Sequence, residues 1–121
     1  MTPTDETRAA IERFHDAVNR HDVDAVLAAI TADCHFESTL PPDGDHYDGA
    51  AAIGAFFRKL FDTVTERTFD IEELVTAGDR AVMRWRHRWT DNSGAPGHVR
   101  GVDVFRVRNG RVAVKLSYVK G

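Results

Sequence analysis

The stretch from Arg80 to Val107 limits the possible folds more than any other part of the sequence. It holds two runs of alternating character, RAVMRWRHRW and HVRGVDVFRV, joined by a segment rich in Gly, Pro and Asn. Alternation with a period of two is typical of strands, so each run presents one largely apolar face. These faces carry Met83, Trp85, His87 and Trp89 in the first run, and Val99, Gly101, Asp103, Phe105 and Val107 in the second. The pattern predicts a hairpin in which His87 and Asp103 are close to cross-strand neighbours.

The opposite faces of the same two runs are basic. They carry Arg84, Arg86, Arg88, Arg100, Arg106 and Arg108, with Val102 and Val104 between them. Nucleic-acid binding is not expected, because the formal net charge of the chain is -3 and no aromatic stacking face accompanies the arginines. A dimer interface and a solvated outer face both fit this pattern.

Helical periodicity appears three times outside this hairpin. One helix is expected from Glu6 to Arg20 with Thr4 or Asp5 as its cap, and a shorter one follows a cap at Asp22. The third and most strongly patterned helix begins at Ala50, and its apolar stripe consists of Ile53, Phe56, Phe57, Leu60, Phe61 and Val64.

The remaining segments predict strands and one loop. Strands are expected over Asp33–Thr39, Thr68–Ala77 and Arg111–Val119, with Asn109-Gly110 as a hairpin turn, and Leu40–Gly49 is expected to be a loop. Val112, Val114, Leu116 and Tyr118 are expected to share a face. The order predicts a single α+β domain over residues 1–121, with three helices on one side of a curved, mostly antiparallel sheet.

Composition narrows the chemistry and the compartment. Cys34 is the only cysteine, which excludes an intrachain disulfide and a cysteine-based metal cluster. Asp43, Asp45, His46 and Asp48 are possible metal ligands, but their spacing fits no established motif, so no metal is expected there. Neither a signal sequence nor a membrane-spanning run is recognisable, and a cytoplasmic location is the expectation.

With this order of elements, the chain resembles the nuclear transport factor two superfold, and within it the SnoaL-like and ketosteroid-isomerase-like groups. The residues that carry the resemblance are RFHDAVNRHDVDAVLAAITADCHFES, YDGAAAIGAFFRKLF, GDRAVMRW and VDVFRVRNGRVA. The resemblance implies a cone-shaped fold with an internal pocket, and a homodimer through the outer sheet face. The superfold hosts isomerases, cyclases, dehydratases and binding proteins, so it does not by itself fix the activity.

Three positions of the ketosteroid isomerase mechanism can be compared one at a time. The position of its catalytic tyrosine falls on Phe14, that of its base falls on Ser38, and that of its second aspartic acid falls on Asp103. Two of the three groups are replaced, so that mechanism is not expected. SnoaL-like cyclases use an aspartate assisted by a histidine on the later strands, and Asp103 and His87 are similar to that pair.

These residues define the site expected from the sequence. Asp103 and His87 are the candidate catalytic residues for proton transfer on a hydrophobic, carbonyl-bearing substrate, without a cofactor. The candidate ligand-binding residues are Phe14, Phe36, Ser38, Phe57, Trp85, Trp89, Phe105 and Tyr118. The alternative is a non-catalytic binding or structural domain in which the same side chains only pack the core. The sequence leaves two alternatives for Glu73: it faces inward as a second acid of the pocket, or either Glu73 or Glu72 pairs with an arginine on the outer side.

Overall fold

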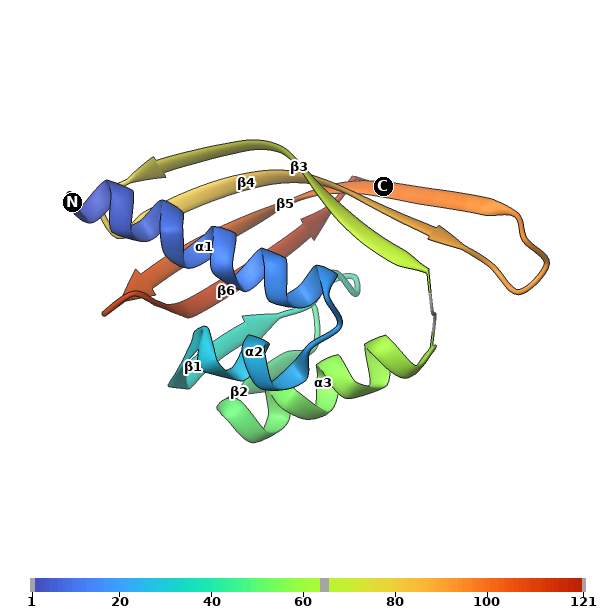
Figure 1. The fold of residues 1–121 in the computed structure, drawn as a ribbon, viewed down its shortest axis with the longest axis horizontal. Helices are drawn as coiled ribbons and strands as arrows, with labels where there is room; N and C mark the ends of the chain where they lie inside the picture. The colour runs from blue at the N-terminus through green and yellow to red at the C-terminus, as the bar shows by residue number, and fades with distance from the viewer. Residues whose placement is uncertain (1, 64–65, 121) are drawn as a thin grey trace.

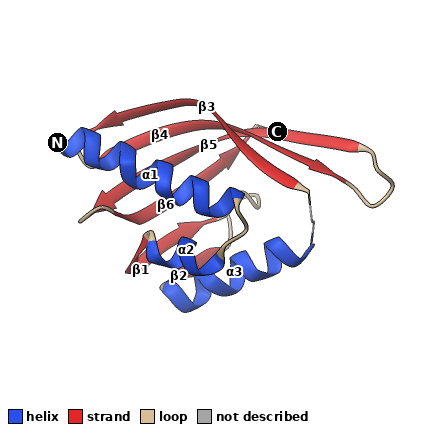
Figure 2. Ribbon diagram, in the orientation of Figure 1, coloured by secondary structure: helices blue, strands red, loops and turns tan. Residues whose placement is uncertain are grey.

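The computed structural model describes residues 2–63 and 66–120. The elements in chain order are α1 (Pro3–Asn19), α2 (Val23–Ala28), β1 (Ile30–Glu37), β2 (His46–Asp48), α3 (Ala50–Thr63), β3 (Arg67–Ala77), β4 (Arg80–Thr90), β5 (Pro96–Arg108) and β6 (Arg111–Val119). The helices pack on one side of a curved, open sheet (Figure 1 and Figure 2). The predicted α+β class, with three helices, is confirmed.

The sheet has six strands in the order β2-β1-β6-β5-β4-β3. Only the β1–β6 pairing is parallel, and the others are antiparallel. The four long strands β3 to β6 form a meander, and the predicted turn between β5 and β6 has positive φ at both Asn109 and Gly110. The tip of the β4–β5 hairpin extends beyond the helices in Figure 1.

The helix boundaries follow their capping residues. α1 begins earlier than predicted because Thr2 caps it: Thr2 Oγ1 accepts a hydrogen bond from the Asp5 amide at 3.1 Å, and Pro3 occupies the first turn. The predicted cap residue Thr4 instead accepts a hydrogen bond from the amide of Gly78 at 3.0 Å. Asp22 caps α2 as predicted. α3 begins at Ala50 as predicted, and the last residue of its predicted stripe, Val64, lies outside the described residues.

Two strand predictions need correction. β1 begins at Ile30 rather than Asp33 and ends at Glu37 rather than Thr39. The segment predicted to be entirely loop contains the short strand β2, which pairs antiparallel with β1 through His35–Asp48 and Glu37–His46. Its composition is turn-like, but pairing with an existing edge strand supplies the backbone partners that the isolated segment lacks.

A bulge in β3 lies between Ile71 and Glu73. The bulge directs the Glu73 side chain to the outer face of the sheet, where Glu73 accepts a hydrogen bond from Arg84 at 3.0 Å. Glu72 accepts one from Arg100, also at 3.0 Å. The prediction that Glu73 or Glu72 pairs with an arginine on the outer side is therefore confirmed, and both acids do so.

A second bulge lies in the β5–β6 pair between Arg106 and Val107. On the side of the bulge nearest the β5–β6 turn, the even-numbered Val112 pairs with the inner residue Val107. On the other side of the bulge, the odd-numbered Ser117 pairs with the inner residue Asp103. This shift moves odd-numbered residues of β6 to the inner face, so the predicted common face of Val112 and Tyr118 is wrong. Tyr118 is 56% exposed.

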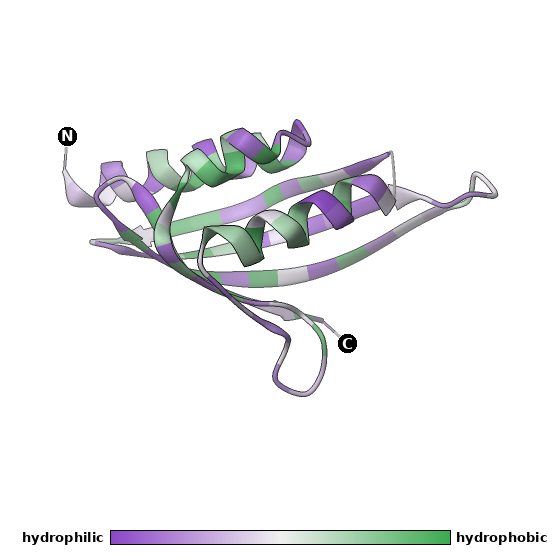
Figure 3. Cartoon of the chain, turned by 90° about the horizontal axis from the view of Figure 1, so that it is seen from below, coloured by the Kyte–Doolittle hydropathy of each residue, from purple (hydrophilic) through white to green (hydrophobic). Residues whose placement is uncertain are grey.

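The core lies between the helices and the inner face of the sheet. Its most buried large side chains include Ile11 of α1, Val26 of α2, Ile30 of β1, Ile53 of α3 and Phe105 of β5. Alternation of hydrophilic and hydrophobic residues along the strands is visible in Figure 3. In the described part of the chain, no helix is both long enough and apolar enough to cross a lipid bilayer.

Candidate functional site

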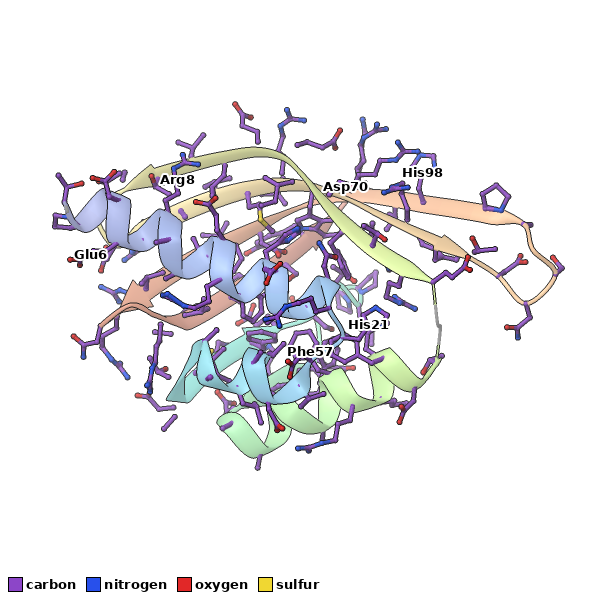
Figure 4. All side chains as sticks on the ribbon, in the orientation of Figure 1. Glu6, Arg8, His21, Phe57, Asp70 and His98 are labelled. Atoms are coloured by element: carbon purple, nitrogen blue, oxygen red, sulfur yellow. The ribbon has the colours of Figure 1, made fainter. Side chains whose placement is uncertain are left out.

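A cavity of about 210 Å³ opens between the helices and the inner face of the sheet. Most of its lining is apolar, as is usual for small-molecule sites. The apolar lining residues are Phe14, Val18, Phe36, Tyr47, Phe56, Phe57, Leu60, Phe69, Met83, Trp85, Val99 and Val119. Phe57 lies in the interior between α1 and α3 (Figure 4), and its ring centroid is 6.1 Å from that of Phe14 and 5.7 Å from that of Phe36.

Two acids line this cavity, Glu37 and Asp103, and Asp103 is the more buried, with its side chain only 6% exposed. Its Oδ2 lies 3.5 Å from Lys115 Nζ, and Ser117 on the neighbouring strand β6 is its cross-strand partner. The Lys115 ammonium donates to Ser117 Oγ at 2.7 Å and lies 4.8 Å from the centre of the Phe36 ring. Asp103 Oδ1, by contrast, is buried without a hydrogen-bond partner among the described residues. A buried carboxylate oxygen with free lone pairs is suited to accept a proton from a ligand.

His87 is not the partner of Asp103. The hairpin register pairs His87 with Val99 and Asp103 with Met83, so the two residues are separated by four positions, or about 13 Å along the strand. The expectation that they are near cross-strand neighbours is therefore wrong. The loop between β4 and β5 sets this register, and the alternation of the runs fixes only the face of each residue.

His87 lies at the other end of the cavity and interacts with Arg67. Its Nε2 is 3.0 Å from Arg67 Nη1, and its ring stacks on Phe69 with the centroids 4.2 Å apart. Because a guanidinium can only donate, Nε2 accepts and the ring is neutral with its proton on Nδ1. Burial, assisted by the charge of Arg67, lowers the pKa of His87 to about 4.

A different histidine, His15 of α1, is within electrostatic range of Asp103. Burial lowers the pKa of His15, and the charge of Asp103 acts in the opposite direction. The ring is held by Asn19, whose Nδ2 lies 3.1 Å from His15 Nε2. Asn19 also bonds both backbone groups of Phe69 at 2.9 Å, which fixes this end of α1 to β3.

Two further polar groups of the cavity lack partners within the described residues. The indole Nε1 of Trp85 and the Nε of Arg67 are buried with no hydrogen-bond acceptor there. Trp85 packs its ring over Gly101, where a Cβ atom would come within 2.4 Å of the indole. Among the buried side-chain atoms of the cavity lining, one acceptor, on Asp103, and two donors thus lack a partner in the described residues, and a ligand with a carbonyl oxygen and an acidic C–H group complements such a set.

The predicted ligand-binding residues fall into two groups. Phe14, Phe36, Ser38, Phe57 and Trp85 line the cavity, and their role in binding remains a prediction. Three others lie outside it: Trp89 packs on Gly97 in the hairpin that extends beyond the helices, Phe105 is in the core beneath Phe14, and Tyr118 points outward. Strand parity places Trp89 and Phe105 on the inner face, but it does not tell how far along the strands the cavity reaches.

Lys115, His15 and Arg67 line the cavity but were absent from the residues chosen on the sequence. The alternation of β6 does not predict an inner position for Lys115, because the bulge in the β5–β6 pair changes which residues face inward. His15 follows Phe14 on α1 and is at the margin of the apolar stripe. Arg67 precedes the predicted start of its strand, and its pairing with Trp89 was not apparent. A group of possible metal ligands, His35, Glu37 and His46, lies on the β1–β2 pair, and its Glu37 also lines the cavity.

The neutral state of His87 predicts a pH dependence of stability. Its folded-state pKa of about 4 lies below the 6.5 of an exposed histidine, so the unfolded chain binds the proton first as the pH falls. Stability is therefore lost between about pH 6.5 and pH 4, by roughly 3 kcal/mol at pH 4. Urea unfolding at pH 7 and pH 4 measures this loss, and His87→Gln should lose correspondingly less. Equal losses in both proteins would contradict the buried, neutral state of His87.

The chain is similar to known proteins in both sequence and structure. Residues 11–115 match the sequence model of the SnoaL-like domain. A crystal structure of an NTF2-like protein of unknown function from Mesorhizobium loti is 35% identical and superposes with a TM-score of 0.83, covering 100% of this chain and 96% of the other. No curated protein has significant similarity to the sequence.

Two more distant structures share the fold. One is a putative polyketide cyclase from Xanthomonas campestris pv. campestris, with 21% identity, a TM-score of 0.78 and coverage of 98% of this chain and 93% of the other. The second is a putative ketosteroid isomerase from Kribbella flavida, with 20% identity, a TM-score of 0.83 and coverage of 100% and 82%.

Proposed function

Because the chain belongs to the SnoaL-like domain family, we propose that it is an enzyme that moves a proton at a carbon next to a carbonyl group, without a cofactor. The observation that carries the proposal is the free Oδ1 of Asp103, buried in an apolar cavity and opposed by the ammonium of Lys115 on its other oxygen. The names of the cyclase and the isomerase with this fold agree with the reaction class.

The proposed reaction begins when Asp103 Oδ1 takes the proton from carbon. The electron pair of the broken C–H bond forms the C=C bond of an enolate, and the carbonyl oxygen receives the negative charge. The Nε1–H of Trp85, a diagonal neighbour of Asp103 on the inner face, is the proposed donor to that oxygen. Return of the proton to the same or another carbon restores Asp103, so the overall reaction is balanced.

The other residues have distinct proposed roles. Lys115 provides the counter-charge of Asp103 and, with Ser117, fixes its orientation. Arg67, held against His87, would bind a second polar group at the far end of the substrate. At about 210 Å³ the cavity is below the usual range for drug-sized ligands, so the proposed substrate has one or two rings rather than a large polycyclic system.

The test is proton exchange on a bicyclic ketone. β-Tetralone, which has an acidic C–H group next to its carbonyl, is incubated with the protein in D₂O, and loss of the α-proton signal is followed by proton NMR. We expect exchange well above the rate in buffer, and inhibition by β-naphthol, an aromatic analogue of the enol. Binding without exchange would instead support the alternative, a non-catalytic ligand-binding domain.

We also propose a homodimer through the outer sheet face. Val75, Val82, Val104 and Leu116 are successive cross-strand partners, and they form one aliphatic row across four strands. The neighbouring arginines already pair with acids, for example Arg84 with Glu73 and Arg106 with Asp79, so the face has both signs of charge next to an apolar row. A second copy of the same face is complementary to it.

The dimer predicts an oligomeric state that one substitution should change. Val82 is 43% exposed, so Val82→Glu should leave the monomer folded but place a buried charge in the interface. Light scattering on the eluting protein should give the dimer mass for the wild type and a shift toward the monomer for the variant. Asn92→Glu, at the tip of the β4–β5 hairpin, is the matched control and should stay dimeric. A wild-type protein of monomer mass at working concentration would contradict the proposal.

A further inference from the structure

Four titratable side chains form a compact group on the β1–β2 pair, away from Asp103. They follow the pattern HFE on β1 and HYD on β2. The register pairs His35 with Asp48 and Glu37 with His46. Alternate residues of a strand share a face, so all four side chains project from the same side of this two-stranded ribbon.

The contacts within this group are short. Asp48 Oδ1 lies 2.6 Å from His35 Nδ1, and Glu37 Oε2 lies 2.9 Å from His35 Nε2. His46 Nε2 is 3.9 Å from the same Glu37 oxygen, and the rings of the two histidines meet edge to face at 5.4 Å. One ligand atom from each of His35, Glu37 and His46 lies within 4.8 Å of the others.

His35 therefore has a carboxylate against each ring nitrogen. A neutral imidazole carries one N–H, which satisfies only one of these contacts and leaves a lone pair directed at the second carboxylate. A cation is needed between Nε2 and Glu37, either a second proton on the ring or a metal ion. When a carboxylate holds the Nδ1–H of a histidine, as Asp48 does here, the Nε2 lone pair is oriented for a metal.

We propose that His35 Nε2, His46 Nε2 and Glu37 form a binding site for a divalent transition-metal ion of the Zn²⁺ class. Two nitrogens and a carboxylate oxygen are ligands that Zn²⁺ accepts, with water at the open position, whereas Ca²⁺ and Mg²⁺ prefer oxygen alone. Ligand atoms of a tetrahedral zinc lie roughly 3.3 Å apart, and the observed 2.9 and 3.9 Å lie on either side of this value. Because the His46 side chain is 53% exposed, a small rotation brings its nitrogen to the required position.

This site could not be predicted from the sequence, because two of its four side chains, His46 and Asp48, belong to a segment predicted to be a loop. Considered alone, the acids and the histidine of residues 43–48 have no regular spacing. The pairing of β2 with β1 brings His46 and Asp48 opposite two residues that are distant in sequence. A bound ion would link the edge strand to β1. Its ligand Glu37 also lines the cavity, but Asp103 is not a ligand, so the site does not depend on the proposed proton transfer.

Metal titration of tag-free protein, first treated with a chelator, tests the site. Calorimetry with Zn²⁺ at neutral pH should show one saturable equivalent, and Co²⁺ should give visible d–d bands at the same stoichiometry. His46→Ala and Glu37→Gln each remove one proposed ligand and should weaken binding at least tenfold, and Asp48→Asn should weaken it roughly tenfold through the loss of His35 orientation. His98→Ala is the matched control, because His98 lies on β5, far from the β1–β2 pair (Figure 4), and its affinity should be unchanged.

Two results would overturn the site: no saturable equivalent in the wild type, or the same affinity in His46→Ala and in Glu37→Gln as in the wild type. Thermal melting of each variant without metal shows that a loss of binding is not a loss of fold. Exchange of β-tetralone protons is measured with and without chelator, so failure of the metal site and failure of the proton-transfer proposal give different results.

Discussion

Replacing Asp103 with Asn should lower the rate of α-proton exchange on β-tetralone by roughly 10³-fold. The amide has nearly the same shape as the carboxylate but cannot accept the proton. In the wild type, Asp103 Oδ1 has no hydrogen-bond partner among the described residues, so its lone pairs are free to take the proton from the substrate. Proton NMR in D₂O measures both rates under one set of conditions.

Two controls separate chemistry from binding and folding. Asp103→Asn should still bind β-naphthol, as measured by quenching of Trp fluorescence, because the aromatic walls of the cavity are unchanged. Asp24→Asn removes an exposed acid of α2 and should exchange at the wild-type rate. If Asp103→Asn retained most of the exchange activity, the assignment of Asp103 as the base would be wrong.

Lys115→Met should destabilise the protein by about 3 kcal/mol at neutral pH, more than the loss of any exposed ion pair. The side chains of Asp103 and Lys115 are 6% and 17% exposed, so removal of the ammonium leaves a buried carboxylate without its counter-charge. Met matches the length and apolar stem of Lys, which keeps the contact with Phe36. Urea unfolding of wild type and variant measures the difference.

The double variant Lys115→Met, Asp103→Asn makes this prediction specific. With both charges removed, more than half of the lost stability should return, because no unpaired charge is then buried. Arg84→Met is the control on the outer face, where the guanidinium pairs with an exposed Glu73, and it should cost well under 1 kcal/mol. Equal costs for Lys115→Met with and without Asp103→Asn would contradict a coupled pair.

The elements with strong periodicity could be predicted from the sequence. The stripe of α3, the Asp22 cap and the Asn109-Gly110 turn depend on local chemistry, and each is where the sequence indicated. The pairing of β2 could not be predicted in this way. It depends on an existing edge at β1, which is a tertiary feature and not a property of residues 40–49.

The sequence predicted which face of the sheet carries the site residues, but it did not predict the cross-strand register that sets their neighbours. Parity placed Asp103 and His87 on the inner side of the sheet, and both line the cavity. A hairpin with a longer loop leaves its register open, and a shift of two residues keeps every side chain on its face while changing all cross-strand partners. Bulges change the face itself, which is why β6 contributes Lys115, Ser117 and Val119 to the cavity rather than Tyr118.

A crystal structure of the protein with β-naphthol would show whether Asp103 and Trp85 are placed to act on a ligand in the cavity. We expect the ligand to lie in the cavity, with its oxygen at Trp85 Nε1 and the ring carbon next to the C–O group about 3.5 Å from Asp103 Oδ1. A ligand that occupies the cavity with its oxygen away from Trp85 and no carbon near Asp103, or one that binds outside the cavity, would contradict it.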